Sequence, residues 1–168
     1  MTLAELNDAA RQQFVAALGW IFEDSPWVAE RAWVQRPFAS VEALHGAMVA
    51  EVVAADPVEQ MALLRAHPDL GARARMSDAS QGEQAGAGLD SLTAEEFDRL
   101  QRLNAAYRAR FGFPFLFAVR GSTKYDVLQA LAARLSAAPD AELAEALQQV
   151  FRIAQFRLHH AIEASSSS

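Results

Sequence analysis

Apolar residues recur at spacings of three and four along nearly the whole chain, which is the period of an amphipathic helix. In the first such stretch, Leu3 and Leu6 are followed by Phe14 and Leu18, and Gly19 ends the pattern. Similar stretches follow one another with short polar breaks between them. We expect helices to begin near residues 2, 26, 40, 57, 80, 93, 123 and 139, and the last of them to run to about residue 162.

Polar residues mark the starts of several of these helices. Thr2 precedes Glu5 by three positions, and Thr93 precedes Glu96 by the same spacing, which is the signature of a capping box. Strands alternating with helices are not seen. The pattern therefore predicts an all-α fold, a single-domain compact bundle of about eight helices over residues 1–164 with a disordered tail at 165–168.

Two segments break the helical period. Residues 67–81 are polar and rich in Gly, Arg and Ser, whereas residues 111–121 contain an apolar, aromatic run between glycines. We expect the second to form a short extended Phe-rich segment. Its buried backbone N–H and C=O groups would need partners, and a small polar ligand is one such partner. Functional residues often lie on non-helical segments held by a rigid scaffold, so both segments are candidates for a site.

Composition excludes several classes of protein. Of the 168 residues, 52% are hydrophobic and 21% are charged, as in globular rather than disordered chains. A formal net charge of −6 argues against non-specific nucleic-acid binding, which needs clustered Lys and Arg. Cysteine is absent, so disulfides, thiolate nucleophiles and Cys-ligated metals are excluded. Neither a signal peptide nor an apolar run of membrane-spanning length is visible, so we expect a soluble cytoplasmic protein without membrane contact.

His67 is the strongest candidate for acid–base chemistry. It lies where Pro68 must end a helix, and a helix C-terminus favours a protonated imidazole. Such a histidine can transfer protons near neutral pH, but it could equally be an exposed, inert residue that only caps the helix. Asp69 could pair with it on a metal ion, but no third ligand is evident. His159 and His160 are adjacent rather than four apart, so no metal site is expected.

The segment from Ser80 to Gln84 is the second candidate. Ser80 and Glu83 have the spacing of a capping box, which predicts a helix start at Ser80 and a structural role for Glu83. The amides of such a helix start could also bind an anion or a carbonyl group. Gln84 offers one acceptor and two donors, which suit a urea or an imide. Capping and catalysis both remain open for Glu83.

Arg157, on the last expected helix, is the third candidate. A lone helical arginine usually extends along the surface into solvent. If its face turns inward, the guanidinium would bind a carboxylate at two points. Spacing alone does not choose it over the other arginines that compete for this role, which are Arg65, Arg73, Arg75, Arg108, Arg110 and Arg120.

Three motifs together resemble one family, the 2-oxo-4-hydroxy-4-carboxy-5-ureidoimidazoline (OHCU) decarboxylases. They are LRAHPDLG at 64–71, SQGEQ at 80–84 with AGL at 87–89, and the stretch 107–119, which includes FGFPF. Each motif alone is weak, but the three in this order and spacing are specific. The likeness covers nearly the whole chain, from the N-terminal helix to Arg157.

The resemblance implies an all-α homodimer that needs no metal or organic cofactor. It implies conversion of the small molecule OHCU into (S)-allantoin in urate and purine degradation. His67 falls on the family's catalytic histidine, and Glu83 on its partner carboxylate. Substrate contacts fall on Pro68, on Ser80, Gln81, Gly82, Glu83 and Gln84, on the backbone of Phe115, Leu116, Phe117, Ala118 and Val119, and on Arg157. Roles for Arg73, Arg75 and Asp78 do not follow from it.

Two other classes of function remain open. One is an enzyme of the same fold that acts on another ureido or imidazole compound. The other is a helical binding module without catalysis, whose Phe-rich segment is a docking groove. The binding module predicts that His67 and Glu83 lie far apart.

Overall fold

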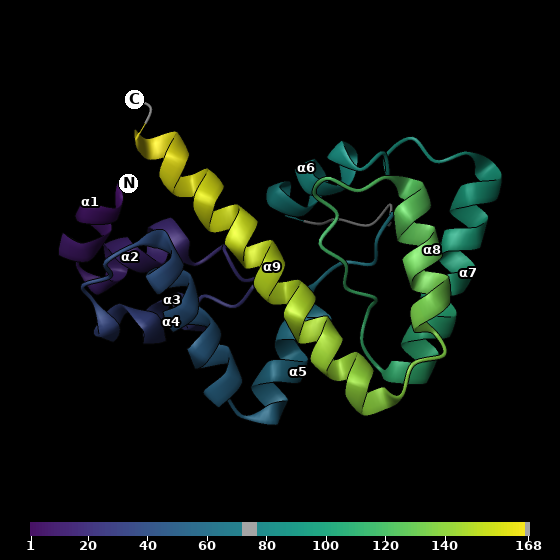
Figure 1. Ribbon diagram of the computed structural model, residues 1–168, viewed down its shortest axis with the longest axis horizontal. Coiled ribbons are helices and arrows are strands. Elements are labelled where there is room, and N and C mark those ends of the chain that lie inside the picture. The colour runs from purple at the N-terminus through teal and green to yellow at the C-terminus, as the bar shows by residue number, and fades with distance from the viewer. Residues whose placement is uncertain (72–76, 167–168) are drawn as a thin grey trace. The chain divides into compact units, whose positions relative to one another are not determined.

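The computed structural model describes residues 1–71 and 77–166, and in that part of the chain it contains nine α-helices, one 3-10 helix and no strand (Figure 1). The elements are α1 (Leu3–Asp8), α2 (Arg11–Leu18), α3 (Trp27–Ala32), η1 (Trp33–Gln35), α4 (Val41–Ala54), α5 (Pro57–Ala66), α6 (Asp78–Gly86), α7 (Ala94–Phe111), α8 (Lys124–Arg134) and α9 (Pro139–Ser166). The prediction of an all-α fold is confirmed.

The helices α7 and α8 begin as the capping pattern predicts. The Thr93 hydroxyl accepts a hydrogen bond from the Glu96 amide, and the Thr93 amide donates to the Glu96 carboxylate at 2.9 Å. Thr123 and Asp126 make the same reciprocal pair at α8. Gly112 ends α7 in the left-handed conformation with a φ of 80°, which a glycine adopts without steric cost.

The single helix expected from residue 2 to residue 18 is interrupted, so this prediction is wrong. Ala9 and Ala10 are extended, with ψ angles of 145° and 157°, and they separate α1 from α2. Trp33 Nε1 and Arg36 Nη1 donate to the Ala9 carbonyl oxygen at 3.0 and 2.8 Å. These side chains replace the intrahelical partner of that carbonyl. They lie more than twenty residues away, so the local pattern contains no sign of the break.

The chain folds as two compact units, which are described separately. Unit 1 comprises residues 1–66 and 151–168, and unit 2 comprises residues 67–150. A single domain ending at residue 164 stays a prediction. The helix α9 extends through Ser166, and the last two residues of the expected tail lie outside the described residues. In the part of the chain that the structure describes, no helix is long and apolar enough to cross a membrane.

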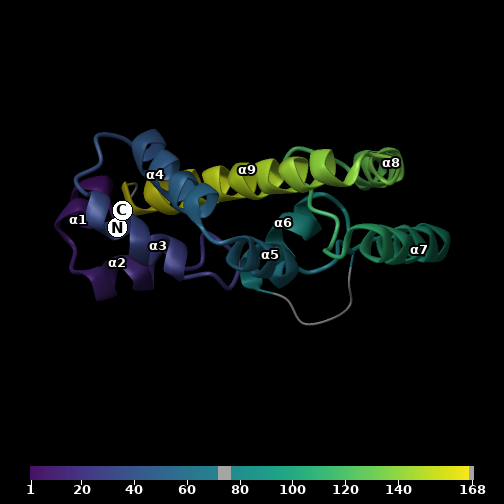
Figure 2. The ribbon, with the colours of Figure 1, turned by 90° about the horizontal axis from the view of Figure 1, so that it is seen from below.

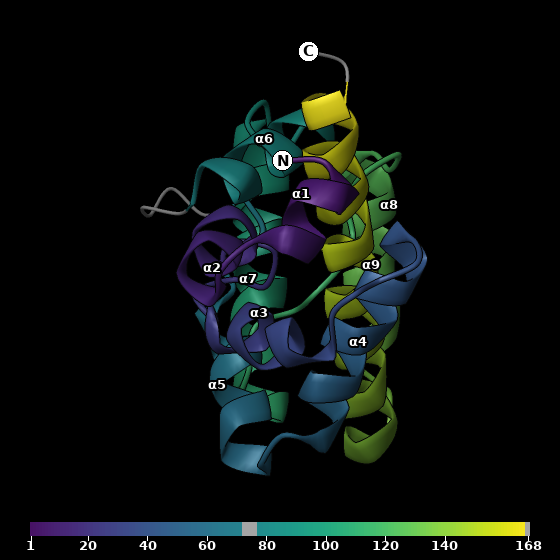
Figure 3. The same ribbon diagram turned by 90° about the vertical axis from the view of Figure 1, so that its left-hand side faces the viewer.

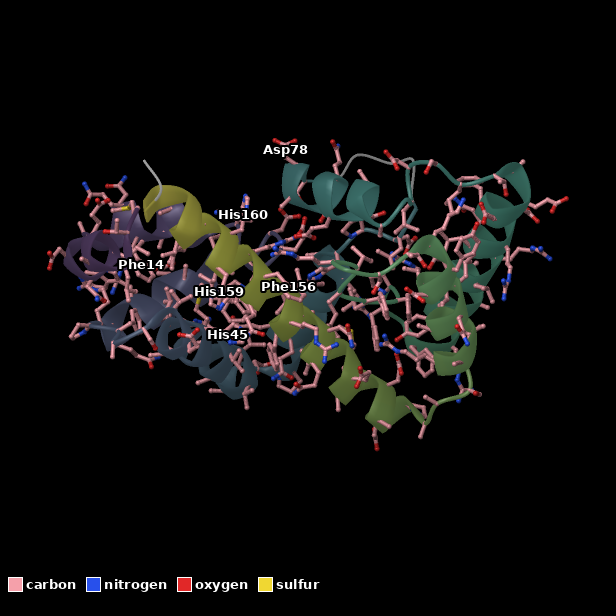
Figure 4. All side chains as sticks on the ribbon, turned by 45° about the horizontal axis from the view of Figure 1, so that its top comes forward. Phe14, His45, Asp78, Phe156, His159 and His160 are labelled. Carbon is pink, nitrogen blue, oxygen red and sulfur yellow. The ribbon has the colours of Figure 1, made fainter. Side chains whose placement is uncertain are left out.

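Large apolar side chains from α2 and α4 form much of the core of unit 1. Phe14 and Met48 are fully buried there. The helix α4 lies beside the C-terminal part of α9 (Figures 3 and 4). At this contact, His45 Nε2 lies 2.8 Å from the Phe151 carbonyl oxygen. His159 is labelled near His45 in Figure 4 and lies in the same unit. It is therefore not part of unit 2, which contains the Phe-rich segment.

Unit 2 contains the Phe-rich segment, which connects α7 to α8. Residues 113–119 have neither helical nor strand structure and follow a stretched course past α8 (Figures 1 and 2). The Tyr107 ring of α7 packs against three phenylalanines, with centroid distances of 4.6 Å to Phe111, 5.8 Å to Phe113 and 5.4 Å to Phe115. This cluster accounts for the burial of a non-helical segment. The predicted short Phe-rich segment outside the helical pattern is thus confirmed.

Candidate active site

His67 follows directly after α5, at the position where Pro68 prevents the helix from continuing. Its side chain is only 6% exposed, so it is not the solvent-exposed histidine of the alternative interpretation. Pro68 beside it is half-buried. A buried imidazole is shielded from bulk water, which is the setting that selective proton transfer requires.

The helix that contains the second motif begins earlier than its sequence predicts. The Ser77 hydroxyl accepts a hydrogen bond from the Ser80 amide at 3.2 Å, which makes Ser77 the N-cap of α6. The predicted capping box of Ser80 and Glu83 is therefore wrong, because Ser80 already lies inside the first turn. Asp78 in that turn favours the earlier start, since a negative charge there interacts well with the helix dipole.

Some residues of the motif on α6 are buried and others are exposed to solvent. Ser80 and Gln84, one helical turn apart, are buried, and Glu83 beside them is half-buried. Gln81 and Gly82 are exposed. The face formed by Ser80, Glu83 and Gln84 is therefore the part of the motif that packs inward.

Gln84 joins α6 to the segment that follows His67. Its Oε1 atom accepts a hydrogen bond from the Gly71 amide at 2.7 Å. Asn104 of α7 donates through Nδ2 to the Leu70 carbonyl oxygen at 3.0 Å. The main chain three and four residues beyond His67 is thus held by two helices. The Gln84 carbonyl oxygen, which suits a urea or an imide, accepts from a backbone amide in the structure.

Side chains of α8 and α9 hold the Phe-rich segment. Arg134 Nη1 donates to the Leu116 carbonyl oxygen at 2.6 Å, and the Ala118 amide donates to Gln149 Oε1 at 2.9 Å. Leu116 and Ala118 are buried. The later part of the segment passes beside α6 in two perpendicular views (Figures 1 and 2), so two of the three motifs lie near each other in unit 2.

The buried carboxylate of Glu142 supports the Phe-rich segment, and the sequence pattern did not indicate it. The Glu142 carboxylate accepts hydrogen bonds from the Tyr107 hydroxyl and from the Arg134 guanidinium. The same guanidinium lies over the Phe115 ring, 4.5 Å from its centroid. Burial, reinforced by the hydrogen bond to Glu142, raises the pKa of Tyr107 far above its ordinary value. No local pattern marks these residues, because 35 positions separate Tyr107 from Glu142.

Arg157 lies in unit 1 and faces inward. Its side chain is 4% exposed, so it is not the solvated surface arginine of the alternative interpretation. Its Nη2 atom lies 3.0 Å from the Glu23 carboxylate, and Nη1 donates to the Trp20 carbonyl oxygen at 3.2 Å. The carboxylate that this guanidinium contacts in the structure is therefore one of the protein's own. His67 and the candidate residues of the other two motifs belong to unit 2.

The structure places the remaining candidate residues as follows. Asp69, considered as a metal partner of His67, forms an ion pair with Arg108 at 3.1 Å. Within residues 1–71 and 77–166, no group of three or more His, Asp or Glu side chains is placed to hold a metal ion. Asp78 is exposed at the first turn of α6, and Arg73 and Arg75 lie outside the described residues.

Comparison with known proteins agrees with the three motifs. The sequence profile of a family described as OHCU decarboxylase matches residues 7–159. A 2-oxo-4-hydroxy-4-carboxy-5-ureidoimidazoline decarboxylase of Haloferax volcanii is 47% identical over 158 residues, which cover 94% of each chain. The uric acid degradation bifunctional protein of Bacillus subtilis is 46% identical over 157 residues, which cover 94% of this chain and 32% of that one.

A solved structure shares the fold. The crystal structure of an (S)-allantoin synthase has a TM-score of 0.78 and 34% sequence identity to this chain. The match covers 96% of this chain and 54% of the other, so this chain spans about half of that protein. With a family profile that matches nearly its whole length and relatives this similar, the chain belongs to the OHCU decarboxylase family.

Proposed function

We propose that this chain catalyses the decarboxylation of OHCU to (S)-allantoin in urate degradation. The observation that carries the proposal is the 47% identity, over 94% of the chain, to the decarboxylase of Haloferax volcanii. The similarity to a uric acid degradation protein supports the pathway. The fold shared with an (S)-allantoin synthase supports the product.

The reaction needs a place for the electron pair of the breaking C–C bond. As CO₂ leaves, this pair can move into the substrate's own imidazoline ring, with the C=N nitrogen as the acceptor. The resulting enol-like intermediate then gains a proton on one face of the carbon that bears the ureido group, which sets the (S) configuration. The enol hydroxyl becomes the carbonyl, and its proton goes to the ring nitrogen. The protein must therefore bind the ring in one orientation and deliver one proton.

His67 is proposed to transfer this proton, and Glu83 to orient the imidazole or the substrate hydroxyl. The burial of His67 supports this role, because water would otherwise compete for the intermediate. The 2.7 Å hydrogen bond between Gln84 and Gly71 supports the pairing. It links the helix that carries Glu83 to the segment that begins with His67.

The other proposed contacts would hold the substrate. The backbone of the Phe-rich segment would bind the ring and ureido amides, and its aromatic side chains would exclude water. Arg157 would bind an anionic or carbonyl group, with Glu23 and the Trp20 carbonyl keeping its guanidinium in place. The remaining proposed contacts are Pro68, Ser80, Gln81, Gly82 and Gln84.

The proposal also includes a homodimer, as the family resemblance implies, and a location in the cytoplasm. Each chain has a mass of 18.3 kDa. Sedimentation equilibrium should therefore give twice this mass. A mass of 18.3 kDa at micromolar concentration would contradict the dimer but would not bear on the proposed reaction.

A coupled assay tests the function. OHCU is generated from urate with urate oxidase and the hydrolase that acts after it, and circular dichroism then follows (S)-allantoin. OHCU also decays spontaneously to racemic allantoin, so the optical signal rather than substrate loss is the readout. We expect a rapid, single-signed signal from the parent protein. His67→Ala should lower kcat by about 10² or more, the usual loss on removing a general acid–base group.

His160→Ala is the matched control, because His160 is exposed. It should keep the parent rate. Full activity in His67→Ala would rule out the proton-transfer role but not the reaction. No signal from the folded parent would reject the reaction itself, and would favour either another ureido substrate or a binding module without catalysis.

A further inference from the structure

The two side chains that bind the main chain of the Phe-rich segment meet alternate residues. Arg134 binds the Leu116 carbonyl, and Gln149 binds the Ala118 amide. In a stretched backbone, the N–H and C=O groups of alternate residues point to the same side. The side chains of α8 and α9 therefore occupy one edge of the segment.

In such a backbone, the groups of the intervening residues point to the opposite edge. The Phe117 amide and carbonyl and the Val119 amide have no hydrogen-bond partner among the residues that the structure describes. Val119 is buried and Phe117 is half-buried. Because unpaired buried backbone groups are costly, this edge favours a ligand that offers both acceptors and donors in a row. A ureido group or a cyclic amide has that pattern.

Gln149 is itself held in one orientation. Its Nε2 atom donates to Glu145 Oε1 at 2.8 Å, one turn earlier on α9. The Gln149 side chain is buried, whereas its neighbour Gln148 is exposed. An amide carbonyl whose other end is bound can keep the Ala118 N–H in a single direction.

We propose that Gln149 is a positioning residue for the substrate, acting through the Ala118 amide. By setting the rotation of the segment about its own axis, Gln149 directs the amides of Phe117 and Val119 toward the substrate. Glu145 supports it by fixing which end of the Gln149 amide faces the segment. The inference rests on the proposed function, because it takes OHCU as the molecule bound at the free edge.

Three variants separate positioning from folding. Gln149→Leu removes the acceptor at nearly constant volume, and Gln148→Leu makes the same change on the exposed neighbour. The double variant Glu145→Gln/Gln149→Glu exchanges the two groups. The carboxylate at position 149 then accepts from the Ala118 amide, while the amide at position 145 donates to that carboxylate, and the net charge of the chain is unchanged.

Steady-state kinetics with OHCU and thermal melts are measured for each variant. We expect Gln149→Leu to raise KM about five- to tenfold with a change in kcat below about twofold, as expected when binding common to the substrate and the transition state is weakened. The exchanged variant should return KM to within about twofold of the parent, and Gln148→Leu should match the parent. A defect of folding alone would lower the melting temperature and the active fraction but leave KM unchanged.

An unchanged KM in folded Gln149→Leu would overturn the inference. If Gln149→Leu does not fold, Gln149→Glu takes its place. Gln149→Glu puts a second carboxylate beside Glu145 and should raise KM. The exchanged variant should reverse this rise in KM. Equal KM values in those two variants would likewise overturn the inference. A parent protein that does not turn over OHCU overturns the proposed function itself, whereas a change confined to KM bears on Gln149 alone.

Discussion

Two features of the backbone near the candidate site require a glycine at position 71. Its φ of +72° lies in the left-handed region, and a Cβ added there would lie 2.4 Å from Leu100 Cδ2. Glycine is the residue that adopts this conformation without steric cost. The same residue donates its amide to Gln84, so its conformation also sets the link between α6 and the segment after His67.

Gly71→Ala should therefore destabilise the protein. The left-handed conformation costs an alanine about 1–2 kcal/mol, and the contact with buried Leu100 adds to this. Gly46→Ala is the matched control, because Gly46 lies inside α4 with open space around its added Cβ. That change should stabilise by about 0.5–1 kcal/mol. Urea denaturation of both variants measures the two effects, and equal free energies of unfolding would contradict this account.

Local sequence indicates residues of suitable chemistry but not their partners. His67 stands out because Pro68 fixes a helix end beside it, whereas spacing alone does not distinguish Arg157 from the other arginines. The inward orientation of Arg157 depends on Glu23, which is more than a hundred positions away, so local spacing could not decide it. Gln149 carries no signal of its own, since its function depends on a backbone amide 31 residues earlier.

At the scale of helices, the starts of α7 and α8 are joined by one ion pair. Lys124 Nζ lies 2.7 Å from the Glu96 carboxylate, which also accepts from the Thr93 amide. The hydrogen bond from Lys124, followed by the bond from the Thr93 backbone, lowers the pKa of Glu96 below its ordinary value. One side chain thus stabilises both the capping of α7 and its attachment to α8.

This pair makes stability depend on pH in a defined direction. A carboxyl group with a lowered pKa in the folded state contributes stability above its unfolded pKa, and the contribution disappears as the pH falls through the folded pKa. The melting temperature of the parent should exceed that of Glu96→Gln at neutral pH, and the difference should shrink below about pH 4.5. Glu95→Gln is the control, since Glu95 is an exposed neighbour in the same turn. A difference that does not change with pH would exclude the ionised pair as its source.

Helix starts with a local cap are the part of the fold that sequence predicts well. Thr93 and Thr123 carry their partner three residues later, so the whole motif is visible in four positions. At α6, two serines three residues apart offered two possible starts, and a flanking acidic residue favoured the first. At Ala9 the break depends on Trp33 and Arg36, which no local window contains.

At the scale of the folded chain, Tyr107 reports on the integrity of unit 2. Its hydroxyl meets Glu142, and its ring packs on Phe113 and Phe115, so it contacts residues of α9 and of the Phe-rich segment at once. Burial keeps this phenol neutral well above the pH at which a free tyrosine ionises. The chain has two tyrosines, so one substitution isolates Tyr107.

In Tyr125→Phe, alkaline titration should show no tyrosinate absorbance while the helical circular dichroism persists. A raised pKa in the folded state means that this stabilisation is present below the unfolded pKa of about 10 and is lost as the pH rises above it. Absorbance and helix loss should therefore change together. Tyrosinate formation near pH 10 with an intact helical spectrum would show that Tyr107 is accessible in the folded protein.

Leu116 and Ala118 make their hydrogen bonds through main-chain atoms. Side-chain substitutions therefore cannot reveal the contribution of these hydrogen bonds. Replacing Leu116 with alanine keeps its carbonyl, and Ala118 has almost no side chain to remove. An alanine scan would therefore pass over the very atoms that hold the segment, whereas a proline or an ester linkage at Ala118 would remove the donor. For the same reason, evolution can vary the side chains along this stretch, provided that they still fill the core, without altering the hydrogen bonds that the backbone presents.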